Sequence, residues 1–219
     1  VPSGQKGIFI GAVKDCVIER VKLDGSYNEG MNHINIGTKC SENVTVRNCV
    51  VTNHVSNAID MNNPELSGFA FTGNLIYGSG GGILAHANNG VIANNVIRDV
   101  ANLGIQIISE SAASYGSNIA VTGNILSGVG TGTDANVFAI KCFNRSNYDG
   151  GFVVTNNIIA WTQNAPTGAN QWSVYALWIS GDVLCSNNVI RGQFGALSLA
   201  VAIQQDLISG DATAHATIT

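Results

Sequence analysis

This chain of 219 residues is poor in charge and in proline. Only 11% of its residues are charged, its formal net charge is −4, and it contains 3 prolines. The few basic residues form no cluster, so the sequence lacks the electrostatic footprint of a nucleic-acid-binding protein. It also lacks an apolar run of the roughly 18 residues that a membrane-spanning helix needs. Neither nucleic acid nor a membrane span is therefore expected.

Paired cysteine motifs are absent as well. The cysteines are Cys16, Cys40, Cys49, Cys142 and Cys185. None forms a CxxC pair, so no metal centre or redox pair is expected. Most of them fall where the repeat described below takes a small apolar or turn residue, which predicts free thiols and a protein made in a reducing cytoplasm. The first residues resemble neither an initiator methionine nor a signal peptide, so we expect a fragment of a longer chain.

A short phrase rich in asparagine and glycine recurs along the chain. Near copies of "VTVRNCVVTN" at Val44 are "FAFTGNLIYG" at Phe69, "IAVTGNILSG" at Ile119, "FVVTNNIIAW" at Phe152 and "VLCSNNVIRG" at Val183. Alignment of the copies gives one asparagine column, Asn74, Asn95, Asn124, Asn157 and Asn188, with Cys49 in the same position one copy earlier. Intervals of about 20 to 50 residues indicate stacked structural units.

The residue before each of these positions is always asparagine or glycine, types that tolerate a left-handed backbone. They are Asn48, Gly73, Asn94, Gly123, Asn156 and Asn187. This pattern predicts a tight corner with a stacked asparagine ladder. Alternating apolar residues before the corner, and a short apolar strand such as "GIQII" further along each unit, predict strands. β-Hairpins would not keep an asparagine in one column.

The fold class expected is therefore all-β, a right-handed parallel β-helix. It would have about seven to eight coils, with three short strands per coil and an asparagine ladder at one corner. Residues 1–219 would form a single domain, with 201–219 as a terminal strand or capping segment.

Phrases such as "NNVIRDVANLGIQI" and "NCVVTNHVSNAIDM" resemble the parallel β-helix repeat of the pectin-lyase-like superfamily. The resemblance covers about residues 7 to 200. It implies a fold shared by pectate lyases, polygalacturonases, alginate lyases and bacteriophage tailspikes. The polygalacturonase signatures "NTD" and "GHG" are absent, whereas the free cysteines, acidic balance and irregular loops are most similar to a tailspike or polysaccharide depolymerase. A virion tail is the location this resemblance implies.

One outward column of the predicted β-helix contains the candidate functional residues. If residues such as Ile34, Ile36, Ile59, Met61, Leu197 and Leu199 point inward, the column between them faces outward. It comprises Asn35, Asp60, Leu84, Gln106, Lys141, Trp178 and Ser198, flanked by His33, Asn62 and His86. In the families that the chain resembles, this sheet forms the sugar cleft. We therefore expect substrate binding by His33, Asn35, Asn62, Gln106 and Trp178, because amides bind hydroxyls and an indole stacks on a sugar ring.

Four residues are the catalytic candidates. Asp60 is predicted as a general acid or base, or as a ligand of a calcium ion that neutralises a uronate, and Glu110 as its carboxyl partner. His86 can accept a sugar proton, and Lys141 can pair with an acidic sugar or abstract a proton. For each of them an ordinary solvated side chain is the alternative. Calcium apart, no cofactor or metal is expected.

Two function classes follow from these residues. The first is recognition and depolymerisation of a bacterial surface polysaccharide, by a lyase or an endo-glycosidase mechanism. The alternative is a non-catalytic glycan-binding or structural β-helix module of a larger protein. The sequence leaves the enzymatic question open.

An apolar stripe is predicted on the surface beside the asparagine corner. The outward position before the corner is Val17, Thr45, Ala70, Val91, Ala120, Val153 and Leu184. The position after the asparagine is Lys22, Val50, Leu75, Val96, Ile125, Ile158 and Val189. Such a stripe is larger than a soluble monomer usually exposes. A homotrimer is expected through Val91, Val96, Ile125, Val153, Ile158, Leu184 and Val189, unless a loop covers these residues or the strand phase is wrong by one.

Overall fold

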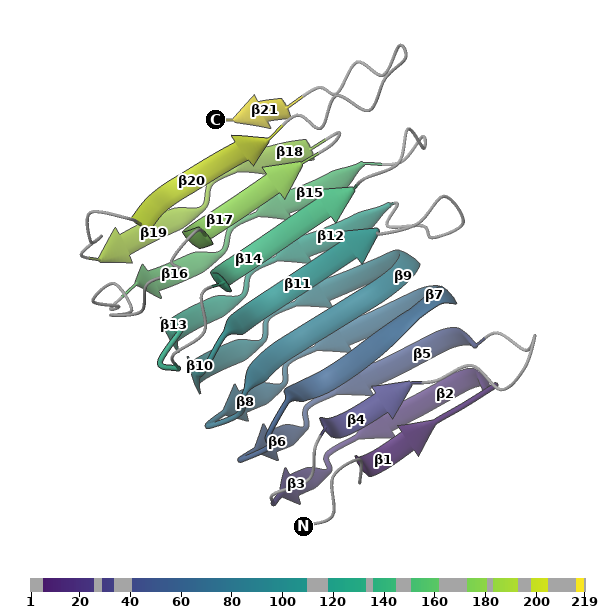
Figure 1. Ribbon diagram of the computed structural model, residues 1–219. Coiled ribbons are helices and arrows are strands. Elements are labelled where there is room, and N and C mark those ends of the chain that lie inside the picture. The colour runs from purple at the N-terminus through teal and green to yellow at the C-terminus, as the bar shows by residue number, and fades with distance from the viewer. Residues whose placement is uncertain are drawn as a thin grey trace.

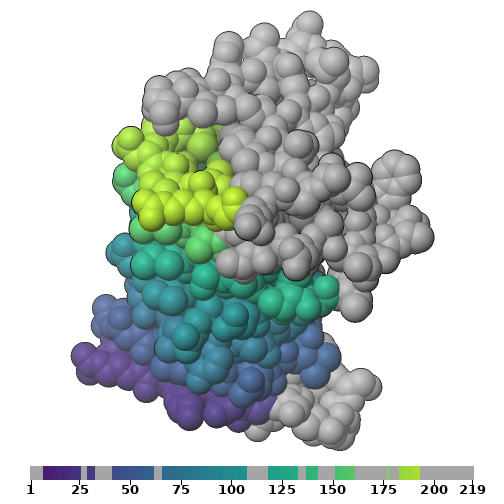
Figure 2. Space-filling model, turned by 90° about the vertical axis from the view of Figure 1, so that its left-hand side faces the viewer, coloured from purple at the N-terminus to yellow at the C-terminus, as the bar shows by residue number. Residues whose placement is uncertain are grey.

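A computed structural model describes residues 6–25, 29–33, 41–109, 118–132, 136–144, 151–161, 173–180, 183–192, 198–204 and 216–218. These residues wind into a parallel β-helix, in agreement with the prediction (Figure 1). The strands belong to a 14-stranded sheet and a 7-stranded sheet. Strands β1, β2 and β3 lie at one end and β20 and β21 at the other. The space-filling view shows the coils following one another in sequence order (Figure 2).

Each coil contributes to three faces, which we number in chain order. Face 1, across the front of Figure 1, consists of β1 (Lys6–Ile10), β4 (Glu29–His33), the first part of β7 (Asn57–Thr72), the first part of β9 (Gly81–Ala93), β11 (Leu103–Ser109), β14 (Asn136–Asn144), β17 (Ser173–Ser180) and β20 (Ser198–Gln204). Face 2 consists of β2 (Lys14–Glu19), β5 (Glu42–Arg47), the second parts of β7 and β9, β12 (Ile119–Thr122), β15 (Phe152–Thr155), β18 (Val183–Ser186) and β21 (Ala216–Ile218).

Face 3 is the separate 7-stranded sheet. It consists of β3 (Lys22–Asp24), β6 (Val50–Thr52), β8 (Leu75–Tyr77), β10 (Val96–Val100), β13 (Ile125–Val129), β16 (Ile158–Trp161) and β19 (Val189–Gly192). All strand pairs are parallel, as the prediction requires. In two coils, however, the strands of faces 1 and 2 are continuous, because β7 and β9 run through the corner between them. The register of β7 against β9 shifts between Asn62 and Leu66 at that corner.

Inward rows of like residues form the core. On face 1, the paired positions Ile59, Ile83, Ile105, Ile140 and Leu177 are all buried. Stacking of identical or similar side chains in register lets each coil bury the face that its neighbour leaves open. The inward prediction is correct for these middle coils.

The first and last coils have a different register from the one expected. Met31 pairs with Ile59, whereas the sequence analysis aligned Ile34 with it. In β20, Val201 and Ile203 pair with Leu177 and Ile179, in place of Leu197 and Leu199. Both errors follow from loops of unequal length, which move a strand along its neighbour without changing its alternating pattern.

The asparagine ladder is present as predicted. The Nδ2 group of Asn74 donates to Oδ1 of Asn95 at 2.9 Å, and the same bond joins Asn95 to Asn124, Asn124 to Asn157 and Asn157 to Asn188. Each oxygen also accepts the backbone N–H of the previous asparagine. Cys49 continues the column, because its N–H donates to Asn74 Oδ1 at 3.0 Å. The ladder therefore satisfies backbone groups that a tight buried corner would leave unpaired.

The residue before each ladder position has a left-handed backbone, also as predicted. The φ angles of Asn48, Gly73, Asn94, Gly123, Asn156 and Asn187 lie between 55° and 66°. Two further left-handed columns were not predicted. One comprises Asp15, Asn43, Gly68, Asn89 and Asn118, and the other Asn53, Gly78, Asp99 and Gly128. The three columns set the three bends of each coil.

Candidate functional site

One outward row of face 1 brings together four of the nine predicted site residues, Asp60, Gln106, Lys141 and Trp178. Parallel pairing aligns, in order along the rod, Phe9, Asn32, Asp60, Leu84, Gln106, Lys141, Trp178 and Ala202. We call these residues the polar row. The sequence analysis placed Asp60, Leu84, Gln106, Lys141 and Trp178 in one column, and the backbone register confirms that alignment.

The two ends of the predicted column are wrong. The register gives Asn32 as the partner of Asp60, and Asn35 lies outside the described residues. Ser198 pairs with Val174, so that Ala202 takes its expected position beside Trp178. His33 pairs with the buried Ile10 and thus belongs to a row next to the polar row.

The N-terminal half of the polar row carries an acidic cluster. Asp60 is 7% exposed and accepts a hydrogen bond from Asn57 Nδ2 at its Oδ2 atom, at 3.0 Å. Asn32 beside it is 5% exposed. Continuing the register of β4 and β7 by two residues places Glu29, 8% exposed, beside Asn57. We call Glu29, Asn32, Asn57 and Asp60 the acidic end.

The oxygen Oδ1 of Asn32 is buried and accepts no hydrogen bond from any group within the described ranges. A buried acceptor without a donor is costly, by about 1 to 3 kcal/mol. The sequence analysis missed Asn32 because it placed the strand of this coil three residues too late, with Asn35 expected where Asn32 pairs with Asp60. Asn57 was missed because the expected strand in its coil began at Ala58. The acidic end is therefore rich in acceptors.

Lys141 marks the opposite half of the polar row. Its side chain is partly buried, and its Nζ lies 4.7 Å from the centre of the Phe138 ring, a cation–π contact. Gln106 precedes it in the row and is largely buried. Lys141 is three strands from Asp60, which at about 4.8 Å per strand is roughly 14 Å. The backbones of these two catalytic candidates are thus separated by two intervening strands.

The remaining candidates fall at the edges of this surface. His86 lies on the strand next to Asp60, and its register partner is Asn62. The side chain of Asn62, like that of Trp178, is not described, and Glu110 lies outside the described residues. The described carboxyl group that shares the acidic end with Asp60 is therefore that of Glu29.

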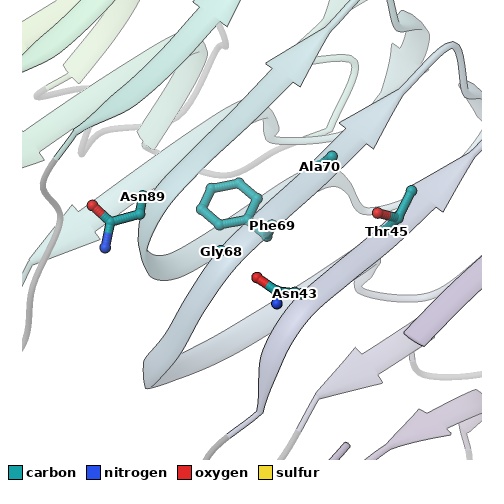
Figure 3. A pocket seen from close by; sticks show the side chains of 6 residues that line it. All are labelled: Asn43, Thr45, Gly68, Phe69, Ala70 and Asn89. Atoms are coloured by element: carbon teal, nitrogen blue, oxygen red, sulfur yellow. The ribbon is translucent and has the colours of Figure 1, made fainter. Parts of the chain in front are cut away.

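A shallow pocket of about 270 Å³ lies on face 2, away from the polar row. Its lining comes from three neighbouring coils: Asn43, Thr45, Gly68, Phe69, Ala70 and Asn89 (Figure 3). A Cβ atom on Gly68, which has a φ of 74°, would lie 2.4 Å from Asn43 Oδ1. The small lining residues of the pocket are Gly68 and Ala70, on either side of Phe69 in β7. It contains none of the predicted site residues.

The two predicted apolar rows lie on faces 2 and 3. Parallel pairing aligns Val17, Thr45, Ala70, Val91, Ala120, Val153 and Leu184 in one row. It aligns Lys22, Val50, Leu75, Val96, Ile125, Ile158 and Val189 in the other. We call both together the apolar stripe. Its large exposed members, from 36% to 55%, are Val17, Val96, Ile125, Val153, Ile158, Leu184 and Val189.

Charges on the apolar stripe are confined to its N-terminal coils. Between the two rows lies a row that begins with Glu19 and Arg47, which form an ion pair, and continues with Thr72, Ala93, Thr122, Thr155 and Ser186. Lys22 pairs with Asp24 at 3.3 Å. In the C-terminal coils, the stripe and the row between its two halves consist of small hydroxyl and aliphatic side chains, and an exposed cation on face 3 is Arg191, two residues after Val189. The strand phase that predicted this stripe was correct.

The described cysteines are free. Cys49, Cys142 and Cys185 are buried, and Cys16 is partly buried. Burial raises the pKa of the Cys142 thiol, and it raises that of Cys185 although Asn188 donates to its sulfur. Buried thiols of this kind are unreactive. Among the described residues, no group of three or more His, Cys, Asp or Glu side chains could hold a metal ion, and no helix is long and apolar enough to cross a membrane.

No family model, no curated protein and no solved structure matches this chain. The parallel β-helix thus stands on the strand register and the ladder.

Proposed function

We propose that this protein recognises a polysaccharide along face 1, with the polar row as the binding surface. The observation that carries the proposal is the row itself. Six of the eight aligned positions are polar or aromatic, the others being Leu84 and Ala202, so positions able to contact a sugar recur along the rod as units recur along a linear polymer. The resemblance of the repeat phrases to the pectin-lyase-like superfamily supports a glycan as that polymer, and a bacterial surface polysaccharide as its class.

Binding is better supported than cleavage. A hydrolase needs two carboxyl groups flanking one bond, and the acidic end contains Glu29 and Asp60. Both are largely buried, however, and Lys141 is about 14 Å from Asp60. Depolymerisation by Asp60, with Glu29 or His86 as its partner, is therefore the second candidate function. A calcium ion at Asp60 belongs to this second candidate.

The test is binding of the purified protein to a panel of capsular and lipopolysaccharide glycans, followed by product analysis. Binding by the parent protein and loss of binding in Gln106→Ala and Lys141→Met would support the proposal. Arg98→Met is the matched control for Lys141→Met, because it removes an exposed cation from face 3. Reducing ends would reveal a hydrolase, and the absorbance of unsaturated uronate would reveal a lyase. If no glycan of the panel binds, the proposal is wrong.

We further propose that the apolar stripe is the contact between parallel copies of this chain, three of them about one axis. Exposed aliphatic side chains in register on four or more coils exceed the scattered apolar residues of an ordinary surface. The uncharged C-terminal part of the stripe can come close to a partner without burying an unpaired charge. A closed symmetric ring of parallel rods also keeps face 1 of every copy accessible.

The oligomeric state tests this contact. Val96→Asp combined with Ile158→Lys should convert a trimer into folded monomers in sedimentation velocity, because both changes place charge in the middle of the stripe. Val55→Asp is the control, since Val55 is exposed but lies outside the stripe. A parent protein that sediments as a monomer at micromolar concentration would contradict the proposal.

A further inference from the structure

The two halves of the polar row differ in their hydrogen-bonding chemistry. At the acidic end, Asp60 and Glu29 contribute carboxylate oxygens, and Asn32 contributes a buried amide oxygen with no donor among the described residues. The amide nitrogen of Asn57 is already bonded to Asp60. In the other half, Lys141 contributes an ammonium group, which donates hydrogen bonds and cannot accept them. The acidic end therefore suits donors, and the Lys141 end suits acceptors.

An exposed aromatic residue adjoins the acidic end. Phe9 is the register partner of Asn32 in the polar row and is 54% exposed. An aromatic ring beside a group of acceptors can contact the apolar face of a sugar while the acceptors bind its polar groups. Phe9 and Asn32 are independent of the carboxylates, so the acidic end has the parts of a sugar-binding site and is more than a cluster of acids.

We propose, on the basis of the glycan-binding function above, that the polar row distinguishes sugar units by charge along its length. The acidic end binds a unit through hydroxyl or ammonium donors and rejects a carboxylate-bearing unit. The Lys141 end, about 14 Å along the row, accepts a carboxylate-bearing or other anionic unit. The ligand class is a mixed polysaccharide in which acidic sugars alternate with neutral or amino sugars, and a polymer of uronic acid alone is excluded.

Like-charge repulsion is the physical reason for the exclusion. A sugar carboxylate placed against Asp60 would bring two negative charges together at a largely buried position, which costs affinity. Glu29 contributes less to this repulsion, because its register partner on the other side is the cationic Lys6. The same sugar carboxylate beside Lys141 gains a charge-assisted hydrogen bond. Ammonium and hydroxyl donors of a bound sugar would instead give Asn32 Oδ1 the partner that it lacks.

The experiment compares oligomers of equal length: chitosan as an amine-bearing probe, chitin as a neutral probe, oligogalacturonate as a purely anionic probe, and hyaluronan as an alternating probe. Calorimetry or fluorescence polarisation is run on the parent protein and on Asp60→Asn, Asn32→Leu and Lys141→Met. We expect the parent to bind hyaluronan or chitosan at least tenfold more tightly than oligogalacturonate. Asn32→Leu should weaken the binding of chitin and chitosan by about tenfold, which corresponds to the loss of one hydrogen bond.

The decisive readout is whether one substitution changes the affinity for different probes in opposite directions. Asp60→Asn should weaken chitosan and strengthen oligogalacturonate, whereas Lys141→Met should weaken oligogalacturonate and hyaluronan only. A variant that merely perturbs the fold would shift all probes in one direction, and urea denaturation of each variant checks that separately. If glycans bind but all probes shift together, or if oligogalacturonate binds best, this inference fails while the proposed function stands. If none of the probes and no panel glycan binds, both fail.

Discussion

Replacing Asn124 by alanine tests the most important structural element of this protein, the asparagine ladder. Asn124 is fully buried. Its Oδ1 accepts the backbone N–H and the Nδ2 group of Asn95, both at 3.0 Å. Its Nδ2 group donates to the carbonyl of Ile92 at 2.9 Å and to Asn157 Oδ1 at 3.0 Å. Alanine removes all four bonds.

Three of the groups left behind lose the partner that the ladder gives them: the backbone N–H of Asn95, one N–H of its side chain, and the carbonyl of Ile92. Asn157 Oδ1 still accepts the backbone N–H of residue 124. At about 1 to 3 kcal/mol for each buried unsatisfied group, the loss is at least about 3 kcal/mol, and we expect about 3 to 6 kcal/mol. Domains are stable by only about 5 to 15 kcal/mol, so the effect is a large share of the total.

Urea denaturation at equilibrium gives the free energy of unfolding and the slope m. Asn124→Ala should lower the midpoint while leaving m unchanged. Asn156→Gly is the matched control, because Asn156 is exposed with a φ of 58°, where glycine is at least as favourable. It should change stability by less than about 0.5 kcal/mol. The side chain of Asn188 is only partly buried. The loss of unfolding free energy in Asn188→Ala should therefore lie between the losses in Asn124→Ala and Asn156→Gly. A loss below about 1 kcal/mol for Asn124→Ala would refute the ladder as a source of stability.

Three other changes test local features of the fold. Cys49→Asn should extend the ladder by one asparagine and raise the free energy of unfolding by about 1 kcal/mol in the same urea assay. Cys49→Ser should give no such increase, and equal stabilities of the two variants would contradict an extended ladder. Gly90→Ala should lower the free energy of unfolding by about 1 to 3 kcal/mol, because the added Cβ would lie 2.1 Å from the Phe69 ring. In a background that carries Phe69→Leu, the same change should cost much less. If the losses of the two single variants simply add in the double variant, the ring is not the cause. The Asn53 amide, with smaller contributions from neighbouring groups, holds the pKa of the Asp24 carboxyl below its ordinary value, so the resulting stabilisation is present above the ordinary pKa and is lost as the pH falls through the lowered one. Asn53→Ala should raise that pKa in an NMR titration, and an unchanged value would contradict the assigned cause.

The sequence predicts the fold well because the asparagine corner fixes the strand phase. A left-handed residue followed by a buried asparagine defines which side of the next strand faces inward, so both rows of the apolar stripe follow from the position of one corner. The register errors are in β4 and β20, whereas β14 and β17, which begin further from their corners at Gly123 and Asn156, were aligned correctly. In β4 the predicted register was wrong by three residues, because the residue paired with Asp60 is Asn32 and the one expected was Asn35.

The size of a register error determines what the error does to a site prediction. A slip of three residues reverses the two sides of a strand, so it hid Asn32 and assigned His33 to the outward side. The slip of four residues in β20, from 198 to 202, preserves the sides but changes the neighbour of Trp178. The alternation around "GMNHINI" favours the wrong register, because Ile34 and Ile36 make one phase more apolar than the phase of Met31, which is the residue that pairs with Ile59.

The distribution of polarity on the outside of this rod is the reverse of the one that water favours. On face 1 the outward Asn32, Asp60 and Gln106 are largely buried, whereas on faces 2 and 3 outward aliphatic residues are exposed. The apolar core lies on the inner side of the same strands. A repeating scaffold with two unusual surfaces on separate faces is suited to contact a polymer with one and its own copies with the other, and substitutions on the two faces should act independently because no residue belongs to both.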